Sequence, residues 1–156
     1  MLTPAEGLIL EFGVATGNTI RHLAKLFPSR TIYGFDSFDG LPEAWGNYRA
    51  GHFACAVPDV PSNVALVAGL FEKTLPAFLA QHEGRAALVH IDCDLYSSTR
   101  TVLDLLSPRI ITGTVIVLDE YWIVEEHERR AFDEFIVNRA YRFDARAYEQ
   151  ACVVML

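Results

Sequence analysis

Short apolar runs recur along the chain and alternate with amphipathic segments. Five of these runs are rich in aliphatic and β-branched residues, which is typical of strands buried on both faces. They are GLILEFG (7–13), RTIYGFD (30–36), NVALVAG (63–69), AALVHID (86–92) and GTVIVLD (113–119). Regular alternation of such strands with helices predicts an α/β fold, in which a doubly wound and mostly parallel sheet carries helices on both faces.

The segments between the strands carry apolar residues at helical spacing. The stripes are Ile20, Leu23, Ala24 and Phe27; Leu75, Phe78 and Leu79; Thr99, Val102, Leu103 and Leu106; and Phe132, Phe135 and Ile136 on a charged helix that begins near Glu125. The tail, YRFDARAY (141–148) followed by ACVVML (151–156), reads as a closing pair of strands. The prediction is therefore a seven-stranded Rossmann-like sheet with an antiparallel C-terminal strand.

Residues 39–62 are the least regular part of the chain. A stretch of this length is too long for a simple connection between two elements. We expect either a binding loop or a loop that contains a short helix.

Composition narrows the class of protein. With 156 residues, of which 51% are hydrophobic, the chain fits a single domain over 1–156 with a sizeable core. A formal net charge of -7 disfavours nucleic acid as the main partner. The three cysteines are far apart and form no CxxC pair, which suits a reducing cytoplasm. No apolar run approaches the roughly 18 to 20 residues that span a bilayer, and we predict no signal peptide.

Four of the predicted strands end in acidic residues. The strand ends carry Glu11, Asp36, Asp92, and the pair Asp119 and Glu120. In open α/β sheets ligands bind outside the carboxyl ends of the strands. These acids therefore mark the place to look for a site.

A glycine turn, EFGVATGNT (11–19), lies between the first strand and its helix. Gly13 and Gly17 allow a tight turn close to a ligand, and Asn18 or Thr19 could cap the helix that follows. Asn18 and Thr19 are, with the two glycines, candidate cofactor-binding residues at the N-terminus of that helix. The spacing differs from the GxGxxG of dinucleotide enzymes. Glu11 would repel a pyrophosphate but favour a ligand with a cationic amino acid group. The alternative is a generic strand-to-helix turn.

Asp36 closes the second strand about twenty residues further on. An acid at this position can accept hydrogen bonds from both ribose hydroxyls. Alternatively it forms an Asx turn, since Ser37 and Gly40 follow it. Taken together, the turn and Asp36 indicate a nucleoside that carries an amino acid, namely S-adenosylmethionine.

The carboxyl ends of the fourth and fifth strands are expected to bring Asp92 near Asp119 and Glu120. Carboxylates that close repel one another unless a cation is present. Oxygen ligands favour Mg²⁺ over zinc, with Ca²⁺ or Mn²⁺ as alternatives. A metal ion here could lower the pKa of a substrate hydroxyl. Asp92 could bind the metal, act as general base, or do both. The chain also lacks the Asn/Asp-Pro-Pro-aromatic stretch common in enzymes that methylate amines, which favours oxygen as the acceptor atom.

Each neighbouring polar residue also has a purely structural interpretation. Asp94 is expected to cap the helix that follows, in competition with Ser97 and Ser98, and Glu120 could point to solvent. Cys93 is expected to be a small buried residue, His90 a core residue, and His22 and His127 surface residues. His52 is the one histidine considered near substrate. The run EEHERR (125–130) is expected to be a solvated helix start.

The chain resembles the macrocin O-methyltransferase (TylF-type) family of class I S-adenosylmethionine-dependent methyltransferases. The matching stretches are EFGVATGNTIRHLA, YGFDSFDGLPE, LVAGLFEKTLP, LVHIDCDLYSSTRTVL, GTVIVLDEY and EEHERRAF. The resemblance implies that Glu11, Gly13 and Gly17 belong to the cofactor loop, and that Asp36 and Ser37 hold the ribose. It further implies that the segment from Gly69 to Phe71 lies against the adenine, and that Asp92, Asp119 and Glu120 bind Mg²⁺, with Asp92 near the methyl-transfer centre.

Members of that family methylate sugar hydroxyls of secondary metabolites, and they carry N-terminal helices where this chain is short. The leading expectation is a Mg²⁺-assisted O-methyltransferase with a small hydroxylated substrate. A shortened S-adenosylmethionine-binding module that acts with a partner chain is the alternative. A nicotinamide-dependent oxidoreductase is a third hypothesis for the function. The sequence leaves open whether the chain forms a homo-oligomer.

Overall fold

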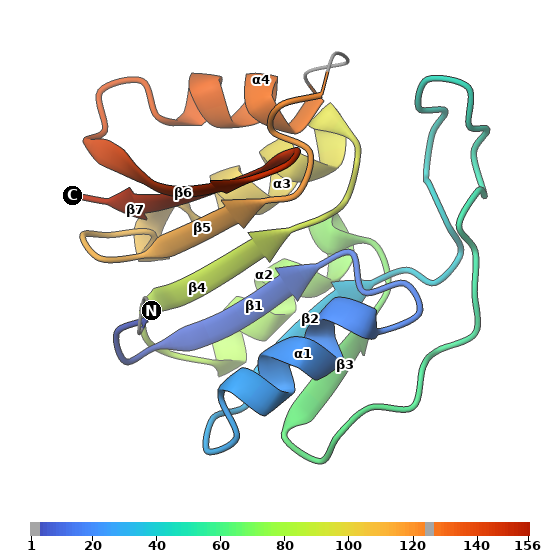
Figure 1. The fold of residues 1–156 in the computed structure, drawn as a ribbon. Helices are drawn as coiled ribbons and strands as arrows, with labels where there is room; N and C mark the ends of the chain where they lie inside the picture. Colours follow the sequence, from blue (N-terminus) through green and yellow to red (C-terminus); the bar gives the residue numbers. More distant parts are fainter. Residues whose placement is uncertain (1–3, 124–126) are drawn as a thin grey trace.

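A computed structural model describes residues 4–123 and 127–156, which form a seven-stranded sheet with the order β3-β2-β1-β4-β5-β7-β6 (Figure 1). The strands are β1 Leu8–Phe12, β2 Ile32–Asp36, β3 Val64–Ala68, β4 Ala86–Ile91, β5 Val115–Leu118, β6 Tyr141–Ala147 and β7 Gln150–Met155. The strands from β1 to β5 pair in parallel, and β7 pairs antiparallel with both β5 and β6. This confirms the predicted fold class, including the closing pair of strands.

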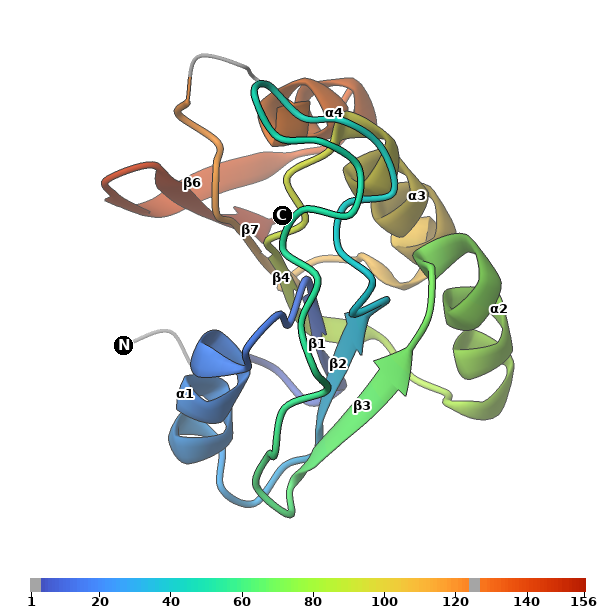
Figure 2. The same cartoon turned by 90° about the vertical axis from the view of Figure 1, so that its right-hand side faces the viewer.

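Helices cover both faces of the sheet. They are α1 Asn18–Leu26, α2 Phe71–Gln81, α3 Tyr96–Leu106 and α4 His127–Phe135, with a short 3₁₀ turn at Ser107–Arg109. In Figure 2 the sheet is seen nearly edge on, with α1 on one side and α2, α3 and α4 on the other. No helix of the described residues is long and apolar enough to cross a membrane.

The buried residues of each helix follow the predicted apolar stripes. In α1 these are Ile20, Leu23 and Ala24, and in α3 they are Thr99, Val102, Leu103 and Leu106. In α4, Phe132 and Phe135 are buried, whereas the predicted start near Glu125 lies outside the described residues. The larger core cluster lies under α2, α3 and α4, where Phe12 and Phe35 stack at 4.8 Å between ring centroids. Burial of these stripes against the sheet supplies the main stabilisation of the fold.

The strand order places the ends of β1, β4 and β5 next to one another. The topology reverses between β1 and β4, because α1 leads the chain to β2 on one side while β4 pairs on the other. Two hydrogen bonds extend the pairing past the strands: Asp92 N–H donates to Phe12 O at 2.9 Å and Asp119 N–H to Ile91 O at 3.0 Å. Such a reversal point is where open α/β sheets bind ligands.

The chain between β2 and β3 runs along this same edge of the sheet (Figure 1). It contains one isolated bridge, between Trp45 and Tyr48, and no helix. Of the two alternatives considered for residues 39–62, the structure therefore shows a loop.

Candidate cofactor and metal site

A cavity of about 480 Å³ opens at the carboxyl edge of the sheet. The ends of β1, β2 and β4, the start of α2 and α3, and the loop after β2 all contribute to it. Its lining includes Gly13, Ala15, Asp36, Ser37, Leu41, Phe53, Gly69, Phe71, Asp92, Cys93, Asp94 and Ser97. The volume lies in the range of small-molecule and cofactor sites.

The glycine turn approaches the end of β4 very closely. Gly13 has φ +92, and a Cβ added to it would lie 1.7 Å from Asp92 O. Gly17 forms the N-cap of α1 in a left-handed conformation, without a side-chain cap. The prediction that Asn18 or Thr19 caps this helix is therefore wrong. Both are exposed residues of its first turn and are outside the described lining of the cavity.

The Asp36 carboxylate holds the glycine turn in place. Its Oδ2 accepts hydrogen bonds from the N–H groups of Val14 and Ala15, both at 2.8 Å. Its Oδ1 accepts from Phe38 N–H at 2.8 Å, which is the Asx turn considered as the alternative. Asp36 also lines the cavity, so one residue both shapes the turn and forms part of the cavity wall.

We expect Asp36→Ala to weaken binding of S-adenosylmethionine by about 100-fold or more, because three backbone N–H groups lose their acceptor and the turn loses its shape. Calorimetric titration measures the affinity, and circular dichroism checks that the sheet persists. Asp39→Ala is the matched control, since Asp39 is an exposed acid on the same loop. An unchanged affinity in Asp36→Ala would contradict this role.

Three further predicted cofactor residues also lie at the cavity. Ser37, Gly69 and Phe71 are all part of its lining. Gly69 N–H donates to Asp36 O at 2.9 Å, which ties the end of β3 to the end of β2. The Phe71 ring packs edge-on against Phe12, with 5.3 Å between the ring centroids. The structure thus brings Asp36 and the residues that follow β3 to the same wall of the cavity.

Glu11 is placed differently from the other predicted cofactor residues. Its side chain is 1% exposed, and its Oε1 lies 3.2 Å from His90 Nδ1 on the neighbouring strand. Burial raises the pKa of Glu11, while the hydrogen bond from His90 opposes that shift. Burial lowers the pKa of His90, but the bond to Glu11 and the nearby acids raise it overall. His90 is confirmed as a partnered core residue, and contact of Glu11 with a cofactor stays a prediction.

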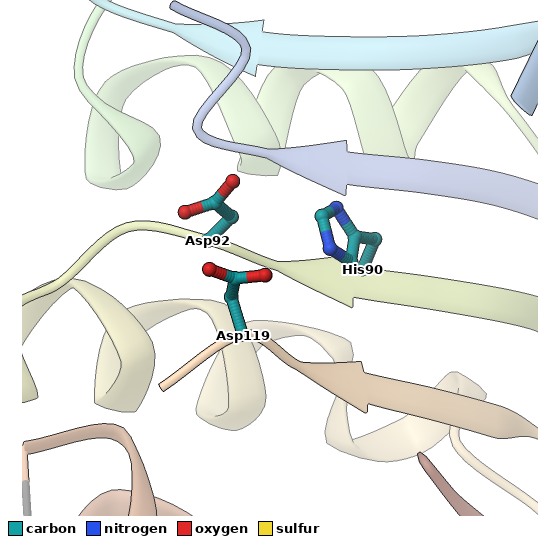
Figure 3. A group of neighbouring side chains, drawn as sticks. All are labelled: His90, Asp92 and Asp119. Atoms are coloured by element: carbon teal, nitrogen blue, oxygen red, sulfur yellow. The ribbon is translucent and has the colours of Figure 1, made fainter. Parts of the chain in front are cut away.

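Asp92 and Asp119 meet at the ends of β4 and β5. Figure 3 shows their carboxylates side by side, with His90 further back along β4. One ligand atom from each of these three residues lies within 4.8 Å of the others. Burial raises the pKa of Asp92 to about 7; the charge of Asp119 adds to the shift and His90 opposes it. Such a cluster of carboxylates is stabilised by a bound cation.

Glu120 lies outside that group of three and pairs with Asp94 instead. Burial, together with Asp94 and Asp92, raises the pKa of Glu120 to about 8. Its Oε2 is buried and has no hydrogen-bond partner among the residues that the structure describes, so the alternative that Glu120 points to solvent is wrong. Asp94 has φ +62 and lines the cavity, whereas the N-cap of α3 is Leu95. The predicted cap by Asp94 is therefore also wrong.

Glu128 is the residue of this region that the sequence interpretation misplaced. It was expected on a solvated helix start, but it is fully buried. Burial raises its pKa well above the usual value, and hydrogen bonds from two backbone N–H groups oppose the shift. The signal was present in the sequence: Glu128 precedes Phe132 by four residues and Phe135 by seven, which puts it on the buried face of α4.

The loop after β2 adds an aromatic group beside the cavity. Tyr48 stacks on Trp45 and on His52, with ring centroids 5.5 and 4.5 Å apart. Phe53 contacts both Tyr48 and His52 and reaches the cavity lining. His52, the histidine considered near substrate, is thus one ring away from the described lining.

Residues 10–121 match the model of a family described as a methyltransferase domain. The chain belongs to that family. A curated relative is the 8-demethyl-8-(2,3-dimethoxy-alpha-L-rhamnosyl)-tetracenomycin-C 4'-O-methyltransferase of Streptomyces olivaceus, 30% identical over 116 residues. The match covers 61% of this chain and 43% of that relative, so the chain spans less than half the length of the protein it matches.

Solved structures agree on the fold. The calicheamicin methyltransferase CalS11 superimposes with a TM-score of 0.78 at 26% identity, over 97% of this chain and 72% of that one. The O-methyltransferase NovP superimposes with a TM-score of 0.74 at 23% identity, over 96% of this chain and 72% of that one. The Bacillus cereus O-methyltransferase was solved in complex with SAH. It superimposes with a TM-score of 0.60 at 16% identity, over 94% of this chain and 71% of that one.

Proposed function

We propose that this domain binds S-adenosylmethionine and transfers its methyl group to a hydroxyl group of a small molecule. The observation that carries this proposal is one cavity that joins the Gly13 turn and Asp36 to Asp92. We propose a sugar hydroxyl as the acceptor, in line with the TylF-type resemblance. The names of two relatives support it: the tetracenomycin enzyme, and CalS11, which is also described as a TDP-rhamnose 3'-o-methyltransferase.

In this proposal residues of the cavity wall would hold the cofactor. Asp36 and Ser37 would hold the ribose, the segment from Gly69 to Phe71 would contact the adenine, and the turn at Gly13 would hold the amino acid end. Bound S-adenosylmethionine supplies a methyl group on a positively charged sulfur. The acceptor oxygen would bond to the methyl carbon as the carbon–sulfur bond breaks, and the electron pair of that bond would stay on sulfur. Asp92 takes the hydroxyl proton.

The residues present fit a hard divalent cation such as Mg²⁺. Asp92 and Asp119 offer carboxylate oxygens that face one another, and within residues 4–123 and 127–156 the buried Oε2 of Glu120 has no hydrogen-bond partner. Asp92 and Asp119 would hold the ion, with Glu120 beside them. When bound, Mg²⁺ supplies positive charge that favours the ionised form of an acceptor hydroxyl. His90 adds a nitrogen to the same group, which the sequence did not predict.

The setting that we propose follows from charge and composition. The net charge of -7 disfavours nucleic acid and leaves a small molecule as the expected partner. The three cysteines without a CxxC pair suit a cytoplasmic location. We further propose that residues 1–156 form one domain.

The deciding experiment is calorimetric titration of the protein with S-adenosylmethionine, and with NAD as control, each with and without Mg²⁺. Binding of S-adenosylmethionine alone supports the proposal and leads to assays with nucleotide-linked rhamnose. Binding without methyl transfer to any hydroxylated acceptor would favour a cofactor-binding module that acts with a partner chain. Binding of NAD would overturn the proposal in favour of an oxidoreductase.

We expect Asp119→Asn to remove the response of the protein to Mg²⁺, because a neutral amide replaces one of the two facing carboxylates. The measurement is the affinity for Mn²⁺, followed by electron paramagnetic resonance, which should fall by about 10-fold or more. Asp104→Asn, at an exposed acid on α3, is the control. A variant that binds Mn²⁺ like the wild type would refute the metal site.

A further inference from the structure

The Glu128 carboxylate bridges the two chain segments that follow β4 and β5. Its Oε1 accepts a hydrogen bond from Cys93 N–H at 3.2 Å, and its Oε2 accepts one from Glu120 N–H at 3.1 Å. Cys93 follows Asp92 directly, and Glu120 follows Asp119 directly. One side chain on α4 therefore binds the N–H group of the residue that follows Asp92 and that of the residue that follows Asp119.

The bridge begins where the backbone pairing between these strands stops. The last hydrogen bond between them is donated by Asp119 N–H to Ile91 O, at 3.0 Å. Beyond it, the N–H groups of Cys93 and Glu120 point to Glu128. Buried N–H groups without an acceptor are costly, so the carboxylate continues the pairing of the two strands by one step.

The position of Glu128 is itself well fixed. It is fully buried, and Ala131 and Phe132 on the same helix are fully buried as well. The helix packs against α3, which starts just after Asp94. A carboxylate on such an anchored helix has little freedom to move relative to the strand ends.

We propose that Glu128 is a positioning residue, whose carboxylate sets the separation of Asp92 and Asp119 by holding the Cys93 and Glu120 peptides. This inference rests on the proposed function, since the two aspartates matter as the site of the cation and of proton transfer. A ligand pair held at a fixed separation binds a cation better than a pair free to spread. Glu128 is not itself part of the described cavity lining, and it reaches the site through the N–H groups of Cys93, which lines the cavity, and of Glu120.

The test compares Glu128→Gln with the wild type and with Phe132→Leu. The amide of Gln keeps one acceptor oxygen but presents its NH₂ group to the second backbone N–H, so one half of the bridge opens. Phe132→Leu perturbs the core of the same helix without touching either peptide. Each protein is titrated with S-adenosylmethionine by calorimetry and with Mn²⁺ by electron paramagnetic resonance.

We expect Glu128→Gln to bind Mn²⁺ at least about 10-fold more weakly than the wild type and to bind S-adenosylmethionine within about threefold. Phe132→Leu should match the wild type in both. Equal Mn²⁺ affinity in Glu128→Gln and wild type would overturn the inference and leave the proposed function intact. A wild type that binds the cofactor but no Mn²⁺ would overturn both the metal site and this role of Glu128.

A measurement on the wild type covers the case in which Glu128→Gln does not fold. The amide protons of Cys93 and Glu120 should exchange with solvent as slowly as those inside β4 and β5, although both lie beyond the strand pairing. Fast exchange at both amides would show that the bridge does not hold in solution and would overturn the inference.

Discussion

Gly13→Ala should abolish binding of S-adenosylmethionine and lower the free energy of unfolding by about 3 kcal/mol or more. A Cβ at this position would lie 1.7 Å from Asp92 O and 2.6 Å from Asp92 C, and both are backbone atoms. Because backbone cannot rotate away as a side chain can, the glycine turn or the end of β4 has to move. The backbone angle of φ +92 adds strain to any residue with a Cβ.

Calorimetric titration and urea denaturation measure the two effects of Gly13→Ala. Gly46→Ala is the matched control, because Gly46 also has a positive φ, of +52, but no described heavy atom lies within 4 Å of a Cβ built there. The control should lose about 1 kcal/mol of stability and no cofactor affinity. If Gly13→Ala bound the cofactor normally, the close approach of the turn to β4 would have no part in the site.

Asp92→Asn should stabilise the metal-free protein at pH 8 while it lowers methyl transfer by about 100-fold or more. The pKa of Asp92 is raised from 3.8 to about 7 in the folded protein, chiefly by burial and then by Asp119. The folded state therefore holds a proton that the unfolded chain has already lost. The contribution of this proton to the free energy of unfolding is complete below about pH 4 and is lost as the pH rises to about 7. Glu120, with its pKa raised to about 8, extends this fall.

Thermal melting between pH 4 and pH 9 tests this prediction. The wild type without metal should melt about 5 °C lower at pH 8 than at pH 5, and the profile of Asp92→Asn should be flatter. Mg²⁺ should raise the melting temperature of the wild type at pH 8, because it binds the ionised acids of the folded state, and should leave the variant unchanged. Asp59→Asn, at an exposed acid, is the control. A wild-type profile that rises with pH would refute the shifted pKa values.

A variant Asp92→Asn that is more stable but less active would show that the acids of this site cost the fold stability and serve catalysis. Several acids crowd the ends of β4 and β5, where water is partly excluded, and such crowding is unfavourable for the fold alone. Residues kept in an unfavourable arrangement are typical of functional sites. If Mg²⁺ raises the melting temperature of the wild type at pH 8, the same acids also bind the ion.

The sequence by itself determined the sheet, most of the helices and the edge of the sheet at which the candidate site lies. Apolar runs such as AALVHID predict strands buried on both faces, and spacings such as Val102, Leu103 and Leu106 predict the buried face of a helix, because both follow from local periodicity. Acids at the ends of parallel strands locate the site, since those ends share one edge. The placement of Asp36 and Asp92 at one cavity could therefore be predicted from the pattern alone.

Only the tertiary structure decided which acid pairs with which group. Glu11 faces His90 on the neighbouring strand, Asp94 pairs with Glu120, and Glu128 reaches back to the ends of β4 and β5. These partners lie far apart in the sequence or on different elements, so no local spacing encodes them. Whether a carboxylate faces solvent, a cavity or a buried N–H group depends on how helices and loops pack around it, and that packing is a property of the whole fold.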